Sequence, residues 1–240
     1  MQSQHSHFKR LLNPQTQQIT LPTEYPDYSK VEYWNARYTE ERGITYDWYL
    51  PWKKTSGAQV GMRDIIVPRL YDDKESEILV LGCGNSELSA KLYAEEGFHY
   101  ITNADYSRVI IEEMKERNAH MEEMDYVEMD ITEPLDILDS ESFTLILDKG
   151  CLDCVACSQD NAGKVRQMLD NVHRTLAPGG TYVCVSHGRP EMRLAQIQGT
   201  AGYKWTVEVQ KVQKRPAGLE VLERVDSEQY YYIYICQKRY

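Results

Sequence analysis

One stretch decides the fold of this chain: residues 77–89, which read Glu-Ile-Leu-Val-Leu-Gly-Cys-Gly-Asn-Ser-Glu-Leu-Ser. Its first part, Ile78 to Leu81, is an unbroken apolar run, as expected of a strand that is buried on both faces. Gly82 and Gly84 then permit a sharp turn and a close approach of the backbone to a ligand. The polar pair after Gly84 can cap a helix. A strand, a glycine turn and a helix start in this order predict a crevice of nucleotide size in an α/β sheet.

Strands and helices alternate along the rest of the chain. Apolar and β-branched runs predict six further strands, at residues 100–104, 126–129, 143–147, 181–185, 205–212 and 230–236. Amphipathic stretches predict helices at 29–39, 62–72 with a bend or restart at Pro68, 87–96, a stretch after Ser107, and 164–176. The alternation stops at residue 186, after which two strands come close together. We therefore predict an α/β fold: a Rossmann-like, doubly wound seven-strand sheet, mostly parallel, with an antiparallel pair at one edge.

Composition and charge limit the classes of partner. The 240 residues carry 27 Lys and Arg against 37 Asp and Glu, a formal net charge of -10. Because an acidic protein repels phosphate backbones, we expect no nucleic acid, and a basic protein would suit it better. No apolar run approaches the length of a membrane span, and residues 1–9 contain no signal-peptide core. Six cysteines in such a chain indicate free thiols, and we predict a cytoplasmic protein with no metal.

The N-terminal part divides into an arm and an aromatic segment. Residues 1–28 are rich in Gln, Ser, Thr and Pro and predict a flexible arm, followed by one domain over 29–240. Within that domain, residues 29–72 form a helical segment that is dense in Tyr and Trp between Tyr33 and Trp52. These rings either pack against the main sheet or form a lid that stacks on a planar ligand, and the residues alone leave both interpretations open.

Aspartates follow three of the predicted strands: Asp105, Asp130 and Asp148. In open α/β sheets, ligands bind beyond the carboxyl ends of the strands. Asp105 follows Gly82 by about 20 residues, the spacing of the acidic residue that accepts hydrogen bonds from ribose hydroxyls. Asp130 can accept from an exocyclic amine. A single such Asp is uninformative because Asp favours turns, but two at successive strand ends after a glycine turn predict a nucleoside site.

The glycine turn departs from the strict dinucleotide fingerprint, in which a third Gly lets a helix pack beside a pyrophosphate. After Gly84 the next Gly is Gly97. This difference disfavours a nicotinamide dehydrogenase and favours a nucleoside ligand without a pyrophosphate, of which S-adenosylmethionine is the obvious one.

These motifs together resemble a known family over roughly residues 29–240. Four segments look like the successive motifs of seven-strand S-adenosylmethionine-dependent methyltransferases: 79–86 (Leu-Val-Leu-Gly-Cys-Gly-Asn-Ser), 104–107 (Ala-Asp-Tyr-Ser), 129–130 (Met-Asp) and 176–180 (Leu-Ala-Pro-Gly-Gly). Three others, 32–38 (Glu-Tyr-Trp-Asn-Ala-Arg-Tyr), 46–49 (Tyr-Asp-Trp-Tyr) and 148–153 (Asp-Lys-Gly-Cys-Leu-Asp), narrow the resemblance to the group that includes lysine methyltransferases of translation elongation factor 1-alpha.

The resemblance implies roles by position. Glycines line the methionine end of the cofactor, an aspartate holds its ribose, and the next strand end contacts the adenine. Aromatic side chains close over it, and a lysine lies at its reactive side. The implied cofactor-binding residues are Trp34, Tyr38, Trp48, Gly82, Gly84, Asn85, Asp105, Tyr106, Asp130, Ile131 and Lys149.

The resemblance also implies a protein substrate, such as elongation factor 1-alpha, whose lysine receives the methyl group. A lysine acceptor must first lose a proton, because its ordinary pKa is about 10.4. Aromatic walls lower that pKa by desolvation. We expect Asp148 and Asp153 to orient the amine, with Lys149 as the third catalytic residue. The group's usual Glu-Lys-Gly-Thr-Leu-Asp reads Asp-Lys-Gly-Cys-Leu-Asp here, so the first carboxylate is one methylene shorter.

Two alternatives to protein-lysine methylation stay open: a small-molecule methyltransferase, and a non-catalytic module that binds the cofactor and a protein partner. The spacing of Cys151, Cys154 and Cys157 resembles a metal or cluster motif, but no fourth Cys follows nearby, and we interpret the three as small apolar residues of a helix. His187 follows the fifth strand and is a candidate base, although a polar loop residue is the simpler interpretation.

Overall fold

The computed structural model describes residues 26–55, 60–134, 137–199, 202–214 and 230–240, together with the backbone of residues 11–12 and 19–20. Leu11–Leu12 (β1) and Ile19–Thr20 (β2) pair as antiparallel strands. Apart from these two strands, residues 1–25 lie outside the described residues, so the prediction of a flexible arm over 1–28 is untested. Among the residues described, no helix combines the length and the apolar character needed to cross a bilayer.

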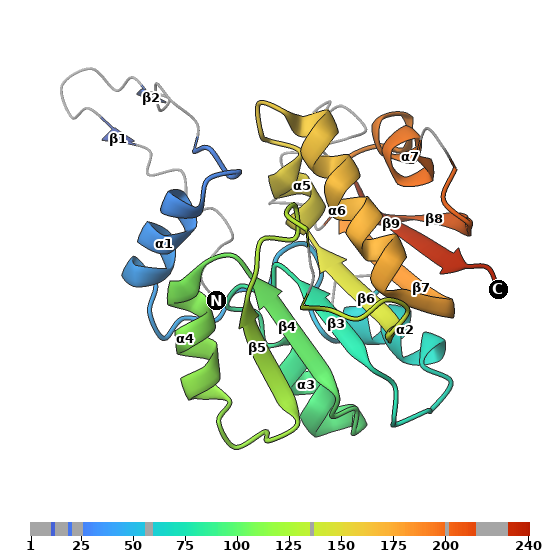
Figure 1. Cartoon of the computed structure of the whole chain (residues 1–240). Helices are drawn as coiled ribbons and strands as arrows, with labels where there is room; N and C mark the ends of the chain where they lie inside the picture. The colour runs from blue at the N-terminus through green and yellow to red at the C-terminus, as the bar shows by residue number, and fades with distance from the viewer. Residues whose placement is uncertain are drawn as a thin grey trace.

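A seven-stranded sheet forms the centre of the molecule (Figure 1). Its strands, in spatial order, are β5 (Met124–Glu128), β4 (Ile101–Asp105), β3 (Ile78–Leu81), β6 (Phe143–Lys149), β7 (Leu176–Ser186), β9 (Tyr230–Lys238) and β8 (Trp205–Gln213). The first five are parallel, whereas β9 runs antiparallel to both β7 and β8. The predicted fold class, with its antiparallel edge pair, is confirmed. The insertion of the C-terminal strand between β7 and β8 was not predicted.

Helices connect the strands. They are α1 (Val31–Glu40), α2 (Met62–Ile66), α3 (Leu88–Glu96), α4 (Arg108–Arg117), α5 (Cys151–Val155), α6 (Asn161–Thr175) and α7 (Pro190–Gln198). The predicted helix over 62–72 is α2 followed by a 3₁₀ turn at Val67–Arg69, and Pro68 lies near the start of that turn, where its missing N–H costs nothing. As predicted, α3 ends at Gly97, which has a left-handed φ of 71°.

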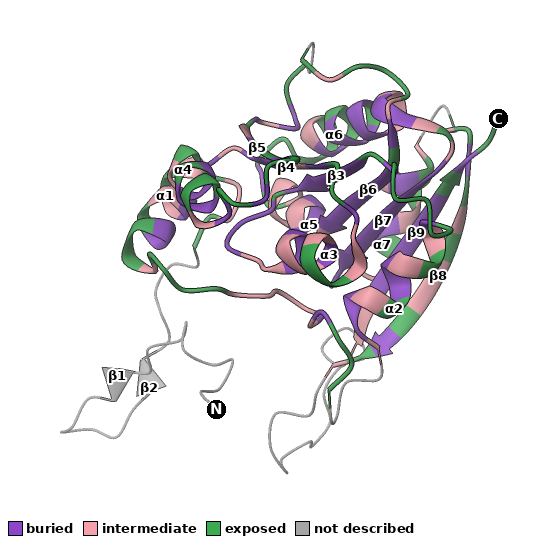
Figure 2. Cartoon of the chain, turned by 90° about the horizontal axis from the view of Figure 1, so that it is seen from below, coloured by how far each residue is buried: buried purple, intermediate pink, exposed green. Residues whose placement is uncertain are grey.

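Both faces of the sheet are covered, as Figure 2 shows by the buried residues between the helices. Because side chains alternate along a strand, Ile78 and Val80 pack with α2, α3 and α4, whereas Leu79 and Leu81 pack with α5, α6 and α7. All four β3 side chains are buried, which explains the unbroken apolar run. The strand therefore anchors the glycine turn rigidly between two cores.

The order in which successive strands join the sheet reverses at β3. From β3 the chain adds β4 and β5 on one side and then returns to add β6 on the other side. Such a switch point opens a crevice at the carboxyl ends of the strands. Two predicted strand ends need correction here. The β5 strand ends at Glu128, so Asp130 lies in the loop beyond it, and Asp148 lies inside β6, which continues to Lys149.

Candidate active site

A cavity of about 410 Å³ lies at the carboxyl ends of β3, β4 and β6, a volume within the range of small-molecule sites. The segment from α1 to Tyr49 forms its other wall. The structure brings nearly all of the predicted site residues together around it: Trp34, Tyr38, Trp48, Gly82, Gly84, Asn85, Asp105, Tyr106, Asp130, Ile131, Lys149 and Asp153. Asp148 is the exception.

The glycine turn forms the floor of this cavity. Gly82 and Gly84 have left-handed φ values of 56° and 51°. A Cβ on Gly82 would lie 2.9 Å from the Cβ of Cys151, and a Cβ on Gly84 would lie 2.9 Å from the hydroxyl of Tyr38. Both positions thus require Gly for conformation and for space.

Asp105 is the last residue of β4 and lies beside this turn. Its carboxylate accepts hydrogen bonds from the backbone N–H of Gly84 at 3.0 Å and of Ser107 at 2.9 Å. Burial raises the pKa of Asp105 to about 6, against the effect of these backbone donors. Ser107 directly precedes α4, but its hydroxyl donates to the side chain of Asn35 on α1 and does not cap the helix.

The aromatic segment both packs and lines the cavity. Trp34 and Tyr38 are buried and stack with ring centroids 5.7 Å apart, and Trp48 meets Trp34 edge to face. The guanidinium of Arg37 lies 5.1 to 5.6 Å from the ring centroids of Trp34, Tyr46 and Trp48. The two interpretations left open by the sequence are therefore compatible, because the same rings fill the core and face the cavity.

Polar contacts tie this segment to the glycine turn. The side chain of Asn85 donates to the carbonyl of Ile44 at 3.0 Å, so Asn85 holds the aromatic segment as well as lining the cavity. Lys149 donates to the carboxylate of Asp47 at 2.7 Å, and Ser86 donates to the same oxygen. Burial lowers the pKa of the Lys149 ammonium, and the Asp47 carboxylate acts against that shift.

Asp148 does not reach the cavity, contrary to prediction. Successive β6 side chains point to opposite faces, so Asp148 turns away where Lys149 lines the cavity. It is 1% exposed, and its carboxylate accepts from the backbone N–H groups of Cys151 and Leu152 and from the Tyr182 hydroxyl at 2.9 Å. Burial raises its pKa to about 6. Asp148 therefore positions the start of α5 and does not orient an amine.

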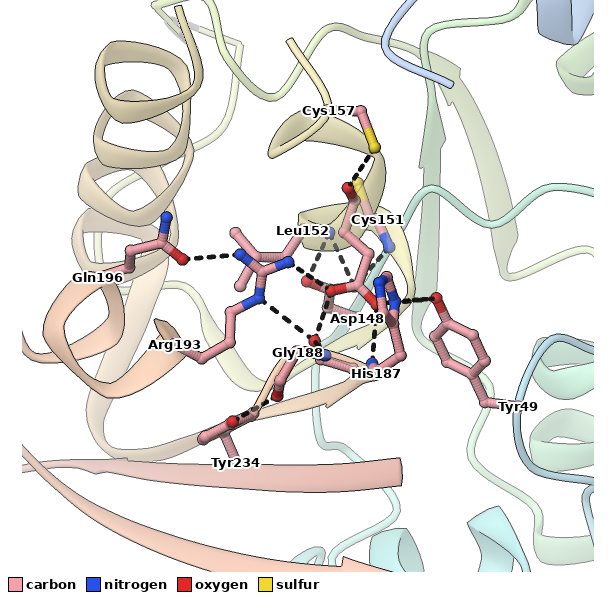
Figure 3. A network of polar contacts seen from close by, with 12 residues as sticks. Tyr49, Asp148, Cys151, Leu152, Cys157, His187, Gly188, Arg193, Gln196 and Tyr234 are labelled. Carbon is pink, nitrogen blue, oxygen red and sulfur yellow. Dashed lines mark hydrogen bonds and ion pairs between the residues drawn. The ribbon is translucent and has the colours of Figure 1, made fainter. Parts of the chain in front are cut away.

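Asp153, on α5, lies at the centre of a polar network. Figure 3 shows Tyr49, His187 and Arg193, the side chains that this network joins. One carboxylate oxygen accepts from Arg193 at 2.8 Å and from the Ser186 hydroxyl. The other accepts from Tyr49 and from both the backbone N–H and Nδ1 of His187. A carboxylate offers about four acceptor sites, and these five donors occupy them in the structure. The Asp153 carboxylate therefore holds neighbouring side chains, and its expected role in orienting the amine stays a prediction.

Sequence reasoning missed Tyr49 and undervalued His187, both of which line the cavity. The position of His187 directly after β7 was the available signal. Cys151, Cys154 and Cys157 also line the cavity, and all six cysteines are free. The part of the chain that the structure describes contains no group of three or more His, Cys, Asp or Glu residues arranged to hold a metal ion.

Comparison with known proteins identifies the family. A family model described as a methyltransferase domain matches residues 72–235. The EEF1A lysine methyltransferase 4 of Mus musculus is 33% identical over 196 residues, which cover 78% of this chain and 72% of the relative. The eEF1A lysine and N-terminal methyltransferase of Bos taurus is 33% identical over 195 residues, 80% of this chain. This chain spans only 26% of the length of that relative.

A solved structure supports the fold. The Burkholderia thailandensis 1,6-didemethyltoxoflavin-N1-methyltransferase matches with a TM-score of 0.57 and 18% identity, over 92% of this chain and 94% of that chain. At this identity the likeness concerns architecture alone. The glycine turn and the cavity at the switch point agree with the family match, which extends over most of the chain. The protein therefore belongs to the class I S-adenosylmethionine-dependent methyltransferases.

Proposed function

We propose that this protein transfers a methyl group from S-adenosylmethionine to a lysine side chain of a protein. The observation that carries the proposal is the cavity at the switch point, in which a glycine turn and a strand-end carboxylate face an aromatic wall. The relatives whose names specify lysine methylation support the choice of acceptor. A small-molecule acceptor and a non-catalytic role are the alternatives.

The residues of the cavity suit this cofactor. The Asp105 carboxylate accepts from the backbone N–H groups of Gly84 and Ser107, and we propose that its remaining acceptor capacity binds ribose hydroxyls. We propose that Asp130 and Ile131, which line the cavity, contact the adenine, and that the methionine part lies against Gly82 and Gly84. The aromatic rings of Trp34 and Trp48 supply flat apolar surface. When bound, the cofactor supplies a methyl group that its sulfonium already activates.

The protein then has two tasks toward the acceptor: positioning and deprotonation. A lysine ammonium entering the cavity loses hydration against aromatic walls, which lowers its pKa from about 10.4. Tyr49 and Tyr231, whose ring centroids lie 4.8 Å apart, form one such wall. Lys149, which lines the cavity, keeps its ammonium paired with Asp47.

We further propose elongation factor 1-alpha as the protein substrate, in the cytoplasm. The names of the relatives support this choice, and the net charge of -10 favours encounter with a basic protein. We propose that residues 29–240 form the catalytic domain, with 29–72 as the segment that covers the cofactor.

A transfer assay tests the proposal. The full chain is incubated with S-adenosylmethionine carrying a tritiated methyl group and with purified elongation factor 1-alpha or a cell lysate. We expect a labelled protein band in which mass spectrometry finds methyl-lysine. Label found only in small molecules would establish a small-molecule methyltransferase. The absence of any label would establish a non-catalytic module.

Two carboxylate variants control this assay. Asp105→Ala removes the ribose partner and is expected to abolish both cofactor binding and labelling. Asp125→Ala removes an exposed carboxylate from the neighbouring strand β5 and is expected to label as the wild type does. Unchanged cofactor affinity of Asp105→Ala in calorimetry would overturn the assignment of the cofactor site.

A further inference from the structure

His187 is held in one orientation at the wall of the cavity. It follows the last residue of β7, and its side chain is 55% exposed while lining the cavity. Its Nδ1 lies 2.7 Å from an oxygen of Asp153, and its own backbone N–H donates to that oxygen at 2.9 Å. The Tyr49 hydroxyl lies 3.2 Å from the same Nδ1. Two contacts thus converge on Nδ1 of the imidazole, the backbone N–H fixes the residue beside them, and Nε2 lies on the opposite edge of the ring (Figure 3).

Asp153 is a fixed anion beneath this ring. The carboxylate side chain is 4% exposed, and Arg193 and Ser186 bind its second oxygen. Burial acts to raise the pKa of Asp153, but the hydrogen bond and the charge of His187, then the charge of Arg193 and the Ser186 donor, outweigh burial and hold that pKa well below its usual range. An ionised carboxylate requires a donor, so it selects the imidazole tautomer with the proton on Nδ1. Nε2 is then an acceptor.

Tyr49 is placed beside His187 at a conformational cost. Its φ of 62° is left-handed, a conformation that is strained for a bulky residue. The hydroxyl bond to Asp153, at 2.8 Å, compensates, and the ring lies over Gly150, where a Cβ would approach it to 3.1 Å. The strain indicates that the position of this ring against His187 is functionally constrained.

We infer that Nε2 of His187 accepts the proton that the substrate amine must release before methyl transfer; the inference rests on the function proposed above. The N–H bond of the ammonium breaks, and the proton forms an Nε2–H bond. The freed lone pair forms the new C–N bond while the S–C bond of the sulfonium donor breaks and leaves its electrons on sulfur. The half-exposed imidazolium then returns its proton to water.

The charged groups around His187 suit this role. On α5, Asp153 stabilises the imidazolium that forms. On α7, Arg193 opposes it, but its guanidinium is bound to Asp153. From the segment before α2 and from β9, Tyr49 and Tyr231 supply neutral rings. Lys164 on α6 and Lys214 after β8 also line the cavity and would contribute to any pH profile, so the test requires a variant that leaves both in place.

The first test uses the full chain without cofactor. In long-range proton–nitrogen NMR spectra of the histidine rings, the signal lost in His187→Asn is assigned to His187. The neutral ring is expected to carry its proton on Nδ1, with Nε2 unprotonated. A neutral ring with the proton on Nε2 would overturn the inference without touching the proposed function.

The second test measures single-turnover transfer to the protein labelled in the assay above, from pH 7 to 9.5. His187→Asn retains an N–H donor for Asp153 but has no counterpart of Nε2. We expect its rate at pH 7 to fall by about 100-fold or more, with cofactor affinity unchanged. The loss should shrink toward pH 9.5, where solvent takes the proton. Added imidazole should partly restore His187→Ala.

The matched control is His120→Asn, an exposed histidine that follows α4, which is expected to behave as the wild type does. A His187→Asn rate within threefold of the wild type, or a loss that is equal at every pH and insensitive to imidazole, would overturn the inference and leave a structural role. Absence of transfer by the wild type would overturn the proposed function and the inference with it.

Discussion

Binding of S-adenosylmethionine should weaken as the pH falls through about 6, because Asp105 is a buried acid in the free protein. Its pKa is raised to about 6 by burial. Ribose hydroxyls donate to the ionised carboxylate, so the complex favours the ionised form and its pKa falls. At pH 7 about nine tenths of the free protein carries the carboxylate, and at pH 5 about one tenth. The dissociation constant should therefore rise about tenfold between these values, or about 1.4 kcal/mol.

Calorimetric titrations of the full chain at pH 5, 6 and 7 measure this change. Repeating the pH 6 titration in two buffers of different ionisation enthalpy counts the protons released, which should be about half a proton per site. Asp105→Asn should bind more weakly and lose the pH dependence. Asp148→Asn is the matched control, since Asp148 is equally buried with a pKa of about 6 but does not line the cavity. A dissociation constant that is equal at pH 5 and 7, or a dependence that survives in Asp105→Asn, would refute the reasoning.

Three further predictions concern the folded state. Asp153→Ala leaves Arg193 buried without its partner and should lower the free energy of unfolding by about 3–5 kcal/mol in urea titrations; a loss under 1 kcal/mol would contradict the network. Gly82→Ala should lower both stability and cofactor affinity through its left-handed φ and its contact with Cys151, and Cys151→Ala should not restore them because the backbone strain remains. Burial raises the pKa of the Asp148 carboxyl from 3.8 to about 6 in the folded protein, so its contribution to stability is present below pH 3.8. That contribution should be lost as the pH rises to about 6, which lowers the free energy of unfolding by about 3 kcal/mol. Asp148→Asn should remove this dependence of the unfolding free energy on pH.

Local sequence patterns were sufficient to predict the architecture. A buried parallel strand needs apolar residues on both faces, and a sharp turn needs Gly, so 77–89 identifies the central strand and its turn without tertiary information. Asp105 could be placed at the site because it ends the strand next to β3, and all parallel strands end at the same edge of the sheet.

The sequence could not predict which of two neighbouring residues faces the cavity. Asp148 and Lys149 are adjacent, and only the register of β6 decides which of them faces the cavity. A register shifted by one residue reverses that assignment, and local propensity leaves strand boundaries uncertain. For this reason Asp148, which was expected to orient the amine, binds protein donors instead.

The chain sequence by itself determined the strand–turn–helix unit, the parallel sheet and the acidic residue beside the turn, because each depends on contacts between near neighbours or on the period of a strand. Only the tertiary structure brought Tyr49, Asp153 and His187 together: Tyr49 lies 104 residues before Asp153 and 138 before His187. No local pattern encodes such a contact. It arises because α5 and the end of β7 meet the aromatic segment over the same edge of the sheet, where packing of both cores fixes their positions.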